Sequence, residues 1–386
     1  MNKIKIVRTA TVSISMKFFL KGQLNFLSTY FDVLAASSDE DYILEDFGRR
    51  ENIRTVSVPM KRKISVVHDL GSLITLIRLF LKERPTIVHS MTPKSGLLSM
   101  LAAKIVGVPV RMHTFTGLIF PERTGLLRLL LITMDRLLCW SATSVYPEGQ
   151  GVLNDLRNYK ITNKPLKVIA NGNINGIDLK YFHPNEVAQS TVVEWLVKLG
   201  IKERDFVWVY VGRLVGDKGI NELVSAFSEL PFDSKLLLVG SYENDLDPLK
   251  RETLKLIADL DSIISVGFQE DIRPFLAMSS CFVFPSYREG FPNVVLQAGS
   301  FNLPCIVTDI NGSNEIIIDG QNGLIHESKD AEQLKNAMIR IFSDDSLRYR
   351  LSKNARELVV EKFSQEYVWE ELFQEYNIQI EELCNI

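Results

Sequence analysis

Short apolar runs alternate with longer amphipathic segments along the whole chain. In the first half, these runs have the composition of buried strands, and the segments between them place apolar side chains three to four residues apart, as a helix does. Pro85 and Gly107 stand where two of these helices should end. The pattern predicts strands at residues 4–7, 86–89 and 108–114 and helices at residues 68–83 and 95–106.

The same rhythm begins again near residue 206. It predicts strands at residues 206–211, 235–239, 262–266, 281–284, 304–307 and 323–326, and helices at residues 220–230 and 248–260, the second with Pro248 at its first position. Alternation of strands and helices predicts a mostly parallel sheet covered on both faces. We therefore expect an α/β protein with two doubly wound parallel sheets.

A chain of 386 residues is long enough for two domains, each with its own core. We expect a first domain over residues 1–186, a second over residues 187–363, and an amphipathic helix over residues 364–386 that packs back toward the first. The polar stretch 184–189 is the expected linker. Because ligands of open parallel sheets bind beyond the carboxyl ends of the strands, two such sheets predict a shared cleft.

Composition narrows the class of protein. The chain is 46% hydrophobic and 24% charged, which excludes a disordered or fibrous protein. Its four cysteines form no CxxC pair, so they suggest neither a zinc site nor a disulfide framework. The longest apolar run, residues 126–134, is too short to span a bilayer, and basic residues interrupt any signal-peptide core near the N-terminus. We expect a protein that is neither secreted nor membrane-spanning.

Charge is distributed unevenly between the two halves. Residues 1–200 hold 26 Lys and Arg against 16 Asp and Glu, whereas residues 201–386 hold 18 against 31. A basic first half suits phosphates, an anionic lipid surface or nucleic acid, although uneven solvation charge alone would give the same count. No zinc finger, aromatic RNA-binding motif or basic helix accompanies this charge, so we expect no nucleic-acid partner.

Two loops at strand ends have the composition of an anion site. The strand 207–211 runs into Gly212, Arg213 and then Lys218-Gly219, so glycines allow backbone amides to approach an anion while two cations stand five residues apart. An exposed loop with incidental basic residues remains the alternative. The second loop, residues 285–292, precedes a helix and places Glu289 at a strand's carboxyl end, where it could contact sugar hydroxyls or simply cap the helix.

These motifs together resemble the C-terminal nucleotide-sugar domain of retaining glycosyltransferase family 4. The motifs are Gly212-Arg213-Leu214 with Lys218-Gly219, residues 267–271, Pro285-Ser286 with residues 289–293, and Asn322-Gly323. The N-terminal half resembles the CapM-like and PglA-like bacterial branch through Val7-Arg8-Thr9, residues 60–65, His89 with residues 92–96, residues 113–117, and residues 175–178 with Phe182.

The resemblance implies a GT-B fold and transfer of a hexose or N-acetylhexosamine, with retention, from a nucleoside diphosphate sugar such as a UDP-sugar. It implies no cofactor and no metal, because Arg213 and Lys218 match the family's diphosphate pair. Glu289 matches the first acid of the Glu-x7-Glu motif and His113 matches the histidine of the N-terminal domain. The donor-binding positions are then Gly212, Phe268, Gln269, Gly290, Phe291, Asn293, Val294 and Gln297.

One position departs from the family pattern. The second acid of the motif is Gln297 here. A glutamine can hydrogen-bond a ribose hydroxyl but loses the charge-assisted part, worth roughly 1 kcal/mol or more. Weaker nucleotide affinity, or a binding module that has lost catalysis, follows as an alternative. A non-hydrolysing nucleotide-sugar epimerase, which shares the double Rossmann architecture, is another.

The resemblance also implies an acceptor and a location. The acceptor is a lipid-linked saccharide on a polyprenyl diphosphate, used in capsule, O-antigen or glycan assembly at the inner face of the bacterial cytoplasmic membrane. Candidate acceptor contacts are Thr9, Lys17, His89 and Lys94. The candidate membrane-facing residues are Lys17, Phe18, Phe19, Lys21, Lys61, Arg62 and Lys63. We expect a cytoplasmic protein held peripherally on an anionic membrane surface.

Overall fold

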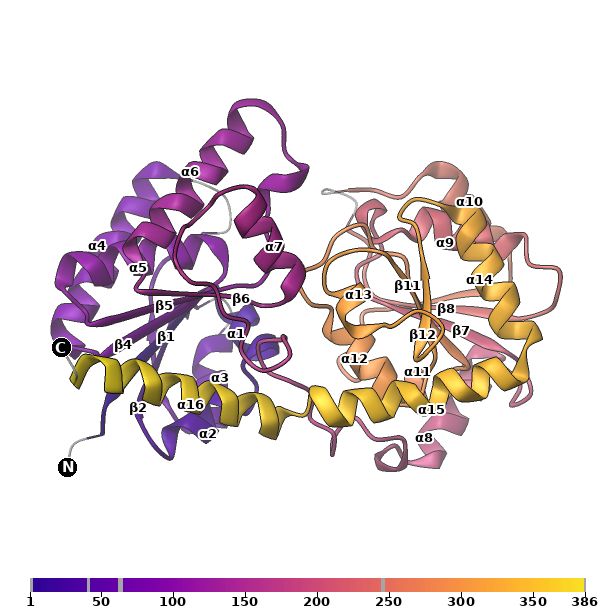
Figure 1. The fold of residues 1–386 in the computed structure, drawn as a ribbon. Helices are drawn as coiled ribbons and strands as arrows, with labels where there is room; N and C mark the ends of the chain where they lie inside the picture. Colours follow the sequence, from indigo (N-terminus) through magenta and orange to yellow (C-terminus); the bar gives the residue numbers. More distant parts are fainter. Residues whose placement is uncertain (1–2, 40–41, 62–64, 244–246, 385–386) are drawn as a thin grey trace. The chain divides into compact units, whose positions relative to one another are not determined.

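The computed structural model describes residues 3–39, 42–61, 65–243 and 247–384. Within these residues the chain forms two compact units, residues 1–176 with 365–386 and residues 177–364 (Figure 1). The chain enters the second unit about ten residues before the expected boundary at 186/187. The expected linker, residues 184–189, lies inside the second unit as a single 3-10 turn and the start of a helix.

A parallel sheet of six strands forms the centre of the first unit, in the order β3-β2-β1-β4-β5-β6. The strands are β1 (Lys5–Val12), β2 (Asp32–Ser38), β3 (Arg54–Ser57), β4 (Ile87–Met91), β5 (Val110–Phe115) and β6 (Ser144–Pro147). Successive residues of one strand enter opposite cores: Ile6 and Val7 are both fully buried, yet they belong to different apolar clusters. This double burial explains why the strands read as apolar runs rather than as alternations.

Helices cover both faces of this sheet (Figure 1). One core includes α4 (Val66–Glu83), α5 (Pro93–Val106) and α6 (Gly125–Ser141), and the other includes α1 (Ser13–Phe19), α2 (Gln23–Ser28), α3 (Ile43–Glu51) and α16 (Gln365–Cys384). A 3-10 turn (Phe120–Glu122) and α7 (Gln150–Asn158) complete the unit.

The last helix, α16, belongs to the first unit although its residues are last in the chain. Its own Tyr376 is fully buried, the Tyr146 hydroxyl donates to Glu375 Oε1 at 2.7 Å, and Trp369 Nε1 donates to Asn175 Oδ1 at 2.8 Å. The amphipathic pattern predicted this helix, and these contacts place it on the face of the sheet formed around Ile6 and Ala10.

The second unit repeats the design with six parallel strands in the order β12-β11-β10-β7-β8-β9. They are β7 (Val207–Val211), β8 (Lys235–Val239), β9 (Ile263–Gly267), β10 (Cys281–Phe284), β11 (Cys305–Thr308) and β12 (Gly323–His326). The helices are α8 (Gln189–Leu199), α9 (Ile220–Ser228), α10 (Arg251–Asp259), α11 (Arg273–Ala277), α12 (Asn293–Ser300), α13 (Ser313–Ile316), α14 (Ala331–Ser343) and α15 (Asp345–Lys362).

In each sheet, the order in which the chain adds strands reverses at one place. In the first unit the chain order reverses between β1 and β4, and in the second unit between β7 and β10. The loops that leave the two strands on either side of such a reversal diverge and open a crevice at the carboxyl edge. The predicted α/β class with two doubly wound parallel sheets is confirmed, and these two crevices are where side chains able to bind a ligand should be sought.

One local prediction is wrong. Pro248 does not open the helix expected at residues 248–260, because α10 begins at Arg251 after an extended Lys250. The amide of Lys250 instead donates to the Asn221 side chain at 3.0 Å, and Thr253 donates to the same oxygen at 2.8 Å. A buried side chain from α9 thus sets where α10 begins.

Candidate functional site

The first cation in the loop after β7, Arg213, forms an ion pair with an acid from the loop after β8. Arg213 Nη1 lies 2.8 Å from Glu243 Oε2, and Glu243 comes from the loop after β8. Fully buried Tyr210 donates its hydroxyl to the Arg213 carbonyl at 2.9 Å, which fixes the backbone of the loop. The guanidinium itself is about 43% exposed, so it can exchange Glu243 for a ligand.

The second cation spans the crevice of this unit. Lys218 Nζ lies 2.5 Å from Glu289 Oε1, with both side chains about 15% exposed. Lys218 ends a 3-10 turn after β7, and Glu289 lies in the loop after β10, so the pair bridges the two strands between which the strand order reverses. Sequence motifs predicted both residues, and the fold brings them together.

Glycines allow the loops around this pair to touch backbone to backbone. Gly219 has φ of +71°, and a Cβ there would lie 2.0 Å from the Pro285 carbonyl oxygen. Gly312, with φ of +76°, would place a Cβ 2.4 Å from the Gly290 carbonyl oxygen. Any side chain at either position would push the loops apart. The glycines therefore fix the spacing between Lys218 and Glu289.

Carboxylates that the sequence did not single out surround these cations. Arg288 Nη2 lies 3.5 Å from Asp217 Oδ2, and the Tyr287 hydroxyl donates to Glu222 Oε2 at 2.5 Å. Asp247 accepts from the Asp217 amide at 2.5 Å. Each partner is distant in sequence, so no local pattern could have shown it. Arg213, Lys218 and Arg288 thus each pair with a carboxylate, so an anion that binds these cations has to compete with acids.

Among the other predicted donor positions, some side chains are at least partly exposed and others are engaged within the unit. Phe268 is 67% exposed beyond β9, and Gln297 is half-buried in α12. Phe291 is buried and packs on the ring of Phe363, and the Gln269 side chain donates to the Val266 carbonyl at 2.8 Å, so these two side chains act within the unit. Gly290, Asn293 and Val294 lie where the loop after β10 enters α12, beside Glu289. Amides of a helix's first turn there have no partner within the helix.

His113 lies near the carboxyl end of β5 in the first unit. Its side chain is 1% exposed, and its Nδ1 lies 2.8 Å from the Ser90 hydroxyl on β4. Burial lowers the pKa of His113 to about 3, so the imidazole is neutral at physiological pH. A Cβ on Gly96 would lie 2.4 Å from the His113 ring, so this glycine makes room for it. His113 can exchange hydrogen bonds but does not supply a positive charge.

A second buried histidine has a different environment. Arg8 on β1 and His89 on β4 are register partners across the reversal of the first sheet, and both are at most 1% exposed. Arg8 Nη1 donates to His89 Nδ1 at 2.5 Å and to the Tyr376 hydroxyl at 2.7 Å. Since a guanidinium only donates, His89 holds its proton on Nε2 and donates to Thr114 Oγ1 at 2.8 Å. Burial and the Arg8 charge lower the pKa of His89 well below its usual value.

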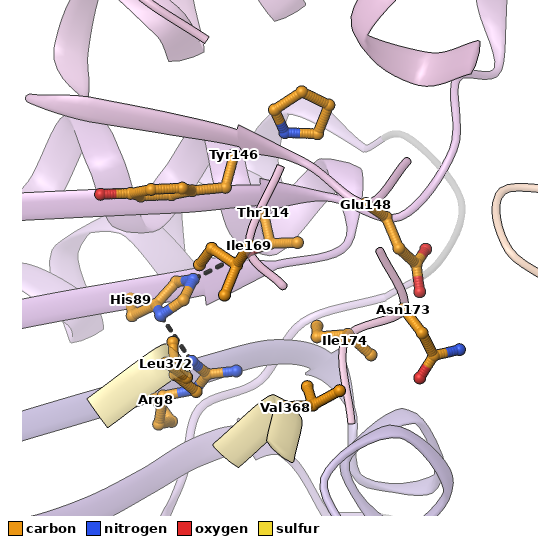
Figure 2. A pocket seen from close by; sticks show the side chains of 11 residues that line it. Arg8, His89, Thr114, Tyr146, Glu148, Ile169, Asn173, Ile174, Val368 and Leu372 are labelled. Carbon is orange, nitrogen blue, oxygen red and sulfur yellow. Dashed lines mark hydrogen bonds between the residues drawn. The ribbon is translucent and has the colours of Figure 1, made fainter. Parts of the chain in front are cut away.

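Arg8 and His89 line a small cavity below α16 (Figure 2). The other lining side chains come from β5, β6, the loops before and after α7, and α16: Thr114, Tyr146, Pro147, Glu148, Ile169, Asn173, Ile174, Val368 and Leu372. The space open to water is about 20 Å³, enough for about one molecule of that size. This space is too small for a sugar ring as the side chains stand.

The predicted acceptor residues are mostly engaged. Thr9 is 1% exposed and accepts from the Ser99 hydroxyl at 2.9 Å. Lys94, 8% exposed, pairs with Asp69 at 2.7 Å. Lys17 is half-buried on α1 beside Phe18, which is 57% exposed, whereas Arg62 and Lys63 lie outside the described residues. An acceptor would reach His89 or Thr9 only if the side chains around them moved.

No group of three or more His, Cys, Asp or Glu side chains that could hold a metal ion gathers in the described part of the chain. Of the carboxylates near Arg213 and Lys218, those of Glu243, Glu289 and Asp217 are instead paired with cations.

Comparison with known proteins bears on what these crevices do. Residues 193–358 match the family described as "Glycosyl transferases group 1", and residues 30–172 match a "Glycosyl transferase 4-like domain". The capsular polysaccharide biosynthesis glycosyltransferase CapM of Staphylococcus aureus is 32% identical over 99% of both chains. The chain belongs to glycosyltransferase family 4. Its sequence motifs had indicated the same family, and that prediction is confirmed.

Other relatives of this family-4 chain agree. An Escherichia coli UDP-Gal:alpha-D-GlcNAc-diphosphoundecaprenol alpha-1,3-galactosyltransferase is 32% identical over 81% of both chains. Among solved structures, a glycosyltransferase of Rickettsia africae superposes with a TM-score of 0.80 at 20% identity over 98% of this chain and 99% of its own. Anabaena HepE in complex with UDP gives 0.81 at 17% identity over 97% and 99%. At these identities the likeness shows the fold, which is GT-B.

Proposed function

We propose that this glycosyltransferase moves a hexose or N-acetylhexosamine from a UDP-sugar to a lipid-linked saccharide, with retention at the anomeric carbon, in capsule or O-antigen assembly. The observation that carries the proposal is the Lys218–Glu289 pair, 2.5 Å apart at the reversal of the second sheet. Two relatives that are each 32% identical support the acceptor class: one acts in capsule synthesis, and the name of the other specifies a diphosphoundecaprenol-linked acceptor and a UDP-galactose donor.

Lys218 and Arg213 bind the diphosphate of the donor in this proposal. The anion replaces Glu289 on Lys218 and Glu243 on Arg213, and two cations then face the charge that grows on the phosphate as the bond to the sugar breaks. Stabilising such charge with preorganised groups is typically worth about 3 to 4 kcal/mol for each contact. No metal is required, because these side chains supply the positive charge.

Glu289, released from Lys218, binds hydroxyls of the donor sugar, and the amides of Asn293 and Val294 at the start of α12 bind phosphate oxygens. In the transfer step, the bond from the anomeric carbon to the β-phosphate oxygen breaks and the acceptor hydroxyl bonds to the same face of that carbon. The hydroxyl proton passes to the departing phosphate oxygen. Neutral His113 donates or accepts a hydrogen bond at the donor sugar, since its low pKa leaves it uncharged.

The experiment is a screen of UDP- and GDP-sugars with bacterial membrane extract as acceptor, scored by release of nucleoside diphosphate and by capture of labelled lipid. We expect one UDP-sugar to give release that requires the extract and that persists in EDTA. Release of an epimerised nucleotide sugar without any acceptor would instead support an epimerase. Binding of donor without turnover would support a module that has lost catalysis.

A further inference from the structure

Exposed apolar side chains gather on three neighbouring helices of the first unit. The described residues contain 26 large apolar side chains that are exposed, and half of them lie between residues 66 and 140. They belong to α4, α5, α6 and the loop before α6: Val66, Val67, Leu70, Ile74, Leu81, Ile105, Ile119, Leu126, Leu127, Leu129, Leu130, Leu137 and Trp140. We call this set the α4–α6 surface. Single exposed apolar residues need no explanation, but a cluster of this size marks a binding surface.

The first turns of α6 are its most exposed part. Leu126 is 86% exposed and Leu129 is 61% exposed, and their neighbours Leu127 and Leu130 are almost half exposed. Figure 1 shows α6 extending beyond the other helices of this unit at its N-terminal end. α6 enters the core through Leu138 and Cys139 near its C-terminus, and Leu131 and Ile132 in its middle pack against the same core while partly buried. Four leucines facing several directions in solvent are not the stripe of a helix that packs on its own sheet.

The same part of the chain is basic. Residues 60–141 hold 12 Lys and Arg against 4 Asp and Glu. Exposed cations lie among the leucines and along the adjacent helices: Arg78, Lys82, Arg123 and Arg136. Two of the acids are already neutralised, because Asp69 pairs with Lys94 at 2.7 Å and Glu83 with Lys5 at 2.8 Å. A surface of leucines and cations together fits an anionic lipid bilayer, where apolar side chains enter and cations meet headgroups.

Helix length decides how such a surface would meet a bilayer. None of the helices in the described ranges is long and apolar enough to cross a membrane. At 1.5 Å per residue the 17 residues of α6 extend about 26 Å, so α6 would lie along the interface rather than through it. Trp140 near its C-terminus, 62% exposed with Lys104 Nζ 3.1 Å from its ring centroid, is a side chain typical of that depth.

The surface also adjoins the edge of the sheet where an acceptor would arrive. α4, α5 and α6 each begin at the carboxyl edge of the strands, since they follow β3, β4 and β5 and run back along the sheet. Asp69 in the first turn of α4 holds Lys94 in the first turn of α5, so the exposed Val66 and Val67 lie one turn from a predicted acceptor contact. A lipid-borne phosphate would come from this direction.

We propose that the α4–α6 surface, with the first turns of α6 inserted, docks this protein on an anionic bilayer and presents the carboxyl edge of the first sheet to lipid-linked acceptors. The docking stands on the exposed leucines and cations alone, whereas its use for acceptor delivery rests on the proposed function. It differs from the surface expected from the sequence, which comprised Lys17, Phe18, Phe19 and Lys21 together with Lys61, Arg62 and Lys63. Of these, Phe18, Lys21 and Lys61 are exposed, Lys17 and Phe19 are half-buried, and Arg62 and Lys63 lie outside the described residues.

The test is flotation of the full chain with vesicles of phosphatidylcholine alone or with about 40% phosphatidylglycerol, whose anionic headgroups attract basic residues. We expect the wild type to float with the anionic vesicles. Changing Leu126, Leu127, Leu129 and Leu130 together to Gln should weaken binding about tenfold or more. The matched control is Val193→Gln with Val197→Gln, two exposed residues of α8 in the second unit, which should change nothing.

Further outcomes separate the alternatives. Retained flotation of the four-leucine variant, or loss of flotation in Phe18→Gln, would overturn the proposal. Light scattering that shows a dimer for the wild type and a monomer for the four-leucine variant would also overturn the proposal. The surface would then bind a second copy of the chain. Melting temperature checks folding, and quenching of Trp140 by brominated lipid, absent in Trp140→Phe, locates the surface independently.

UDP binding is measured on the same samples. The leucine variant should bind UDP as the wild type does, so loss of docking and failure of the proposed function give different results. A wild type that floats but binds no UDP would overturn the function and leave the docking surface standing.

Discussion

Lys218 Nζ and Glu289 Oε1 lie 2.5 Å apart, and they join the loops that leave β7 and β10. The two residues are 71 positions apart in the sequence, yet they meet because the strand order of the second sheet reverses between their strands. The pair joins the two loops across the crevice. In the proposed function, each residue loses the other when a diphosphate sugar binds, and the pair then supplies a cation and an acid to the donor.

Removing either member of the pair should slow transfer strongly. Lys218→Ala and Glu289→Gln should each lower kcat/KM by about two orders of magnitude or more, because each removes one contact to the charged or sugar part of the donor. Lys353→Ala and Glu357→Gln, an exposed pair 3.8 Å apart on α15, are the matched controls and should leave the rate unchanged. Near-normal turnover in both crevice variants would remove the site assignment.

Gln297 gives a test of affinity rather than rate. Glutamate at this position would accept hydrogen bonds from ribose hydroxyls with a full charge, which is worth roughly 1 kcal/mol more than an amide. Gln297→Glu should therefore lower the Kd for UDP about fivefold in calorimetry. Weaker binding would mean that residue 297 does not face the ribose.

Gly219 tests whether backbone contact sets the crevice. Gly219→Ala combines a left-handed φ of +71° with a Cβ only 2.0 Å from the Pro285 carbonyl oxygen. Gly200→Ala has a similar φ of +65° with nothing within 4 Å of its Cβ, so it measures the cost of conformation alone. We expect thermal unfolding to show a larger loss of stability for Gly219→Ala, by more than about 1 kcal/mol. Equal losses would mean that the loops separate without cost.

Asp135 on α6 gives a pH dependence of stability. Burial raises its pKa to about 7 from an ordinary value of 3.8. Between these pH values the folded chain holds a proton that the unfolded chain has lost, so the free energy of unfolding falls as pH rises from about 4 to 7. Asp135→Asn should match the wild-type melting temperature near pH 4 and exceed it at pH 8.

The exposed Asp259→Asn on α10 is the control for this titration and should show no such difference. An Asp135→Asn variant that is less stable than the wild type at pH 8 would contradict the prediction, because it would mean that the charged carboxylate is favoured in the fold.

The sequence predicted the parts of the fold whose strands are apolar and doubly buried. The strands at residues 235–239, 281–284 and 323–326 have the predicted limits, and Gly107 ends α5 in the left-handed conformation expected of a helix stop. β2, β3 and β6 were not predicted, because β2 ends in small and polar residues and the other two are only four residues long. A short or weakly apolar run carries little periodic signal.

The site could be predicted less completely, for a physical reason. Loop motifs contain the glycines and cations that an anion site requires, so they identified Arg213, Lys218 and Glu289. They could not identify Glu243, Asp217 or Glu222, whose partners come from other loops and are set by tertiary packing. For the same reason no pattern showed that Arg8 would hold His89 beneath α16.

The most direct measurement is a crystal structure of the full chain with UDP in the presence of EDTA. The proposal predicts the β-phosphate within hydrogen-bond distance of Lys218 Nζ and of the Arg213 guanidinium, with Glu289 released from Lys218 and no metal bound. UDP bound away from both cations, or Lys218 still paired with Glu289 beside a bound nucleotide, would contradict it.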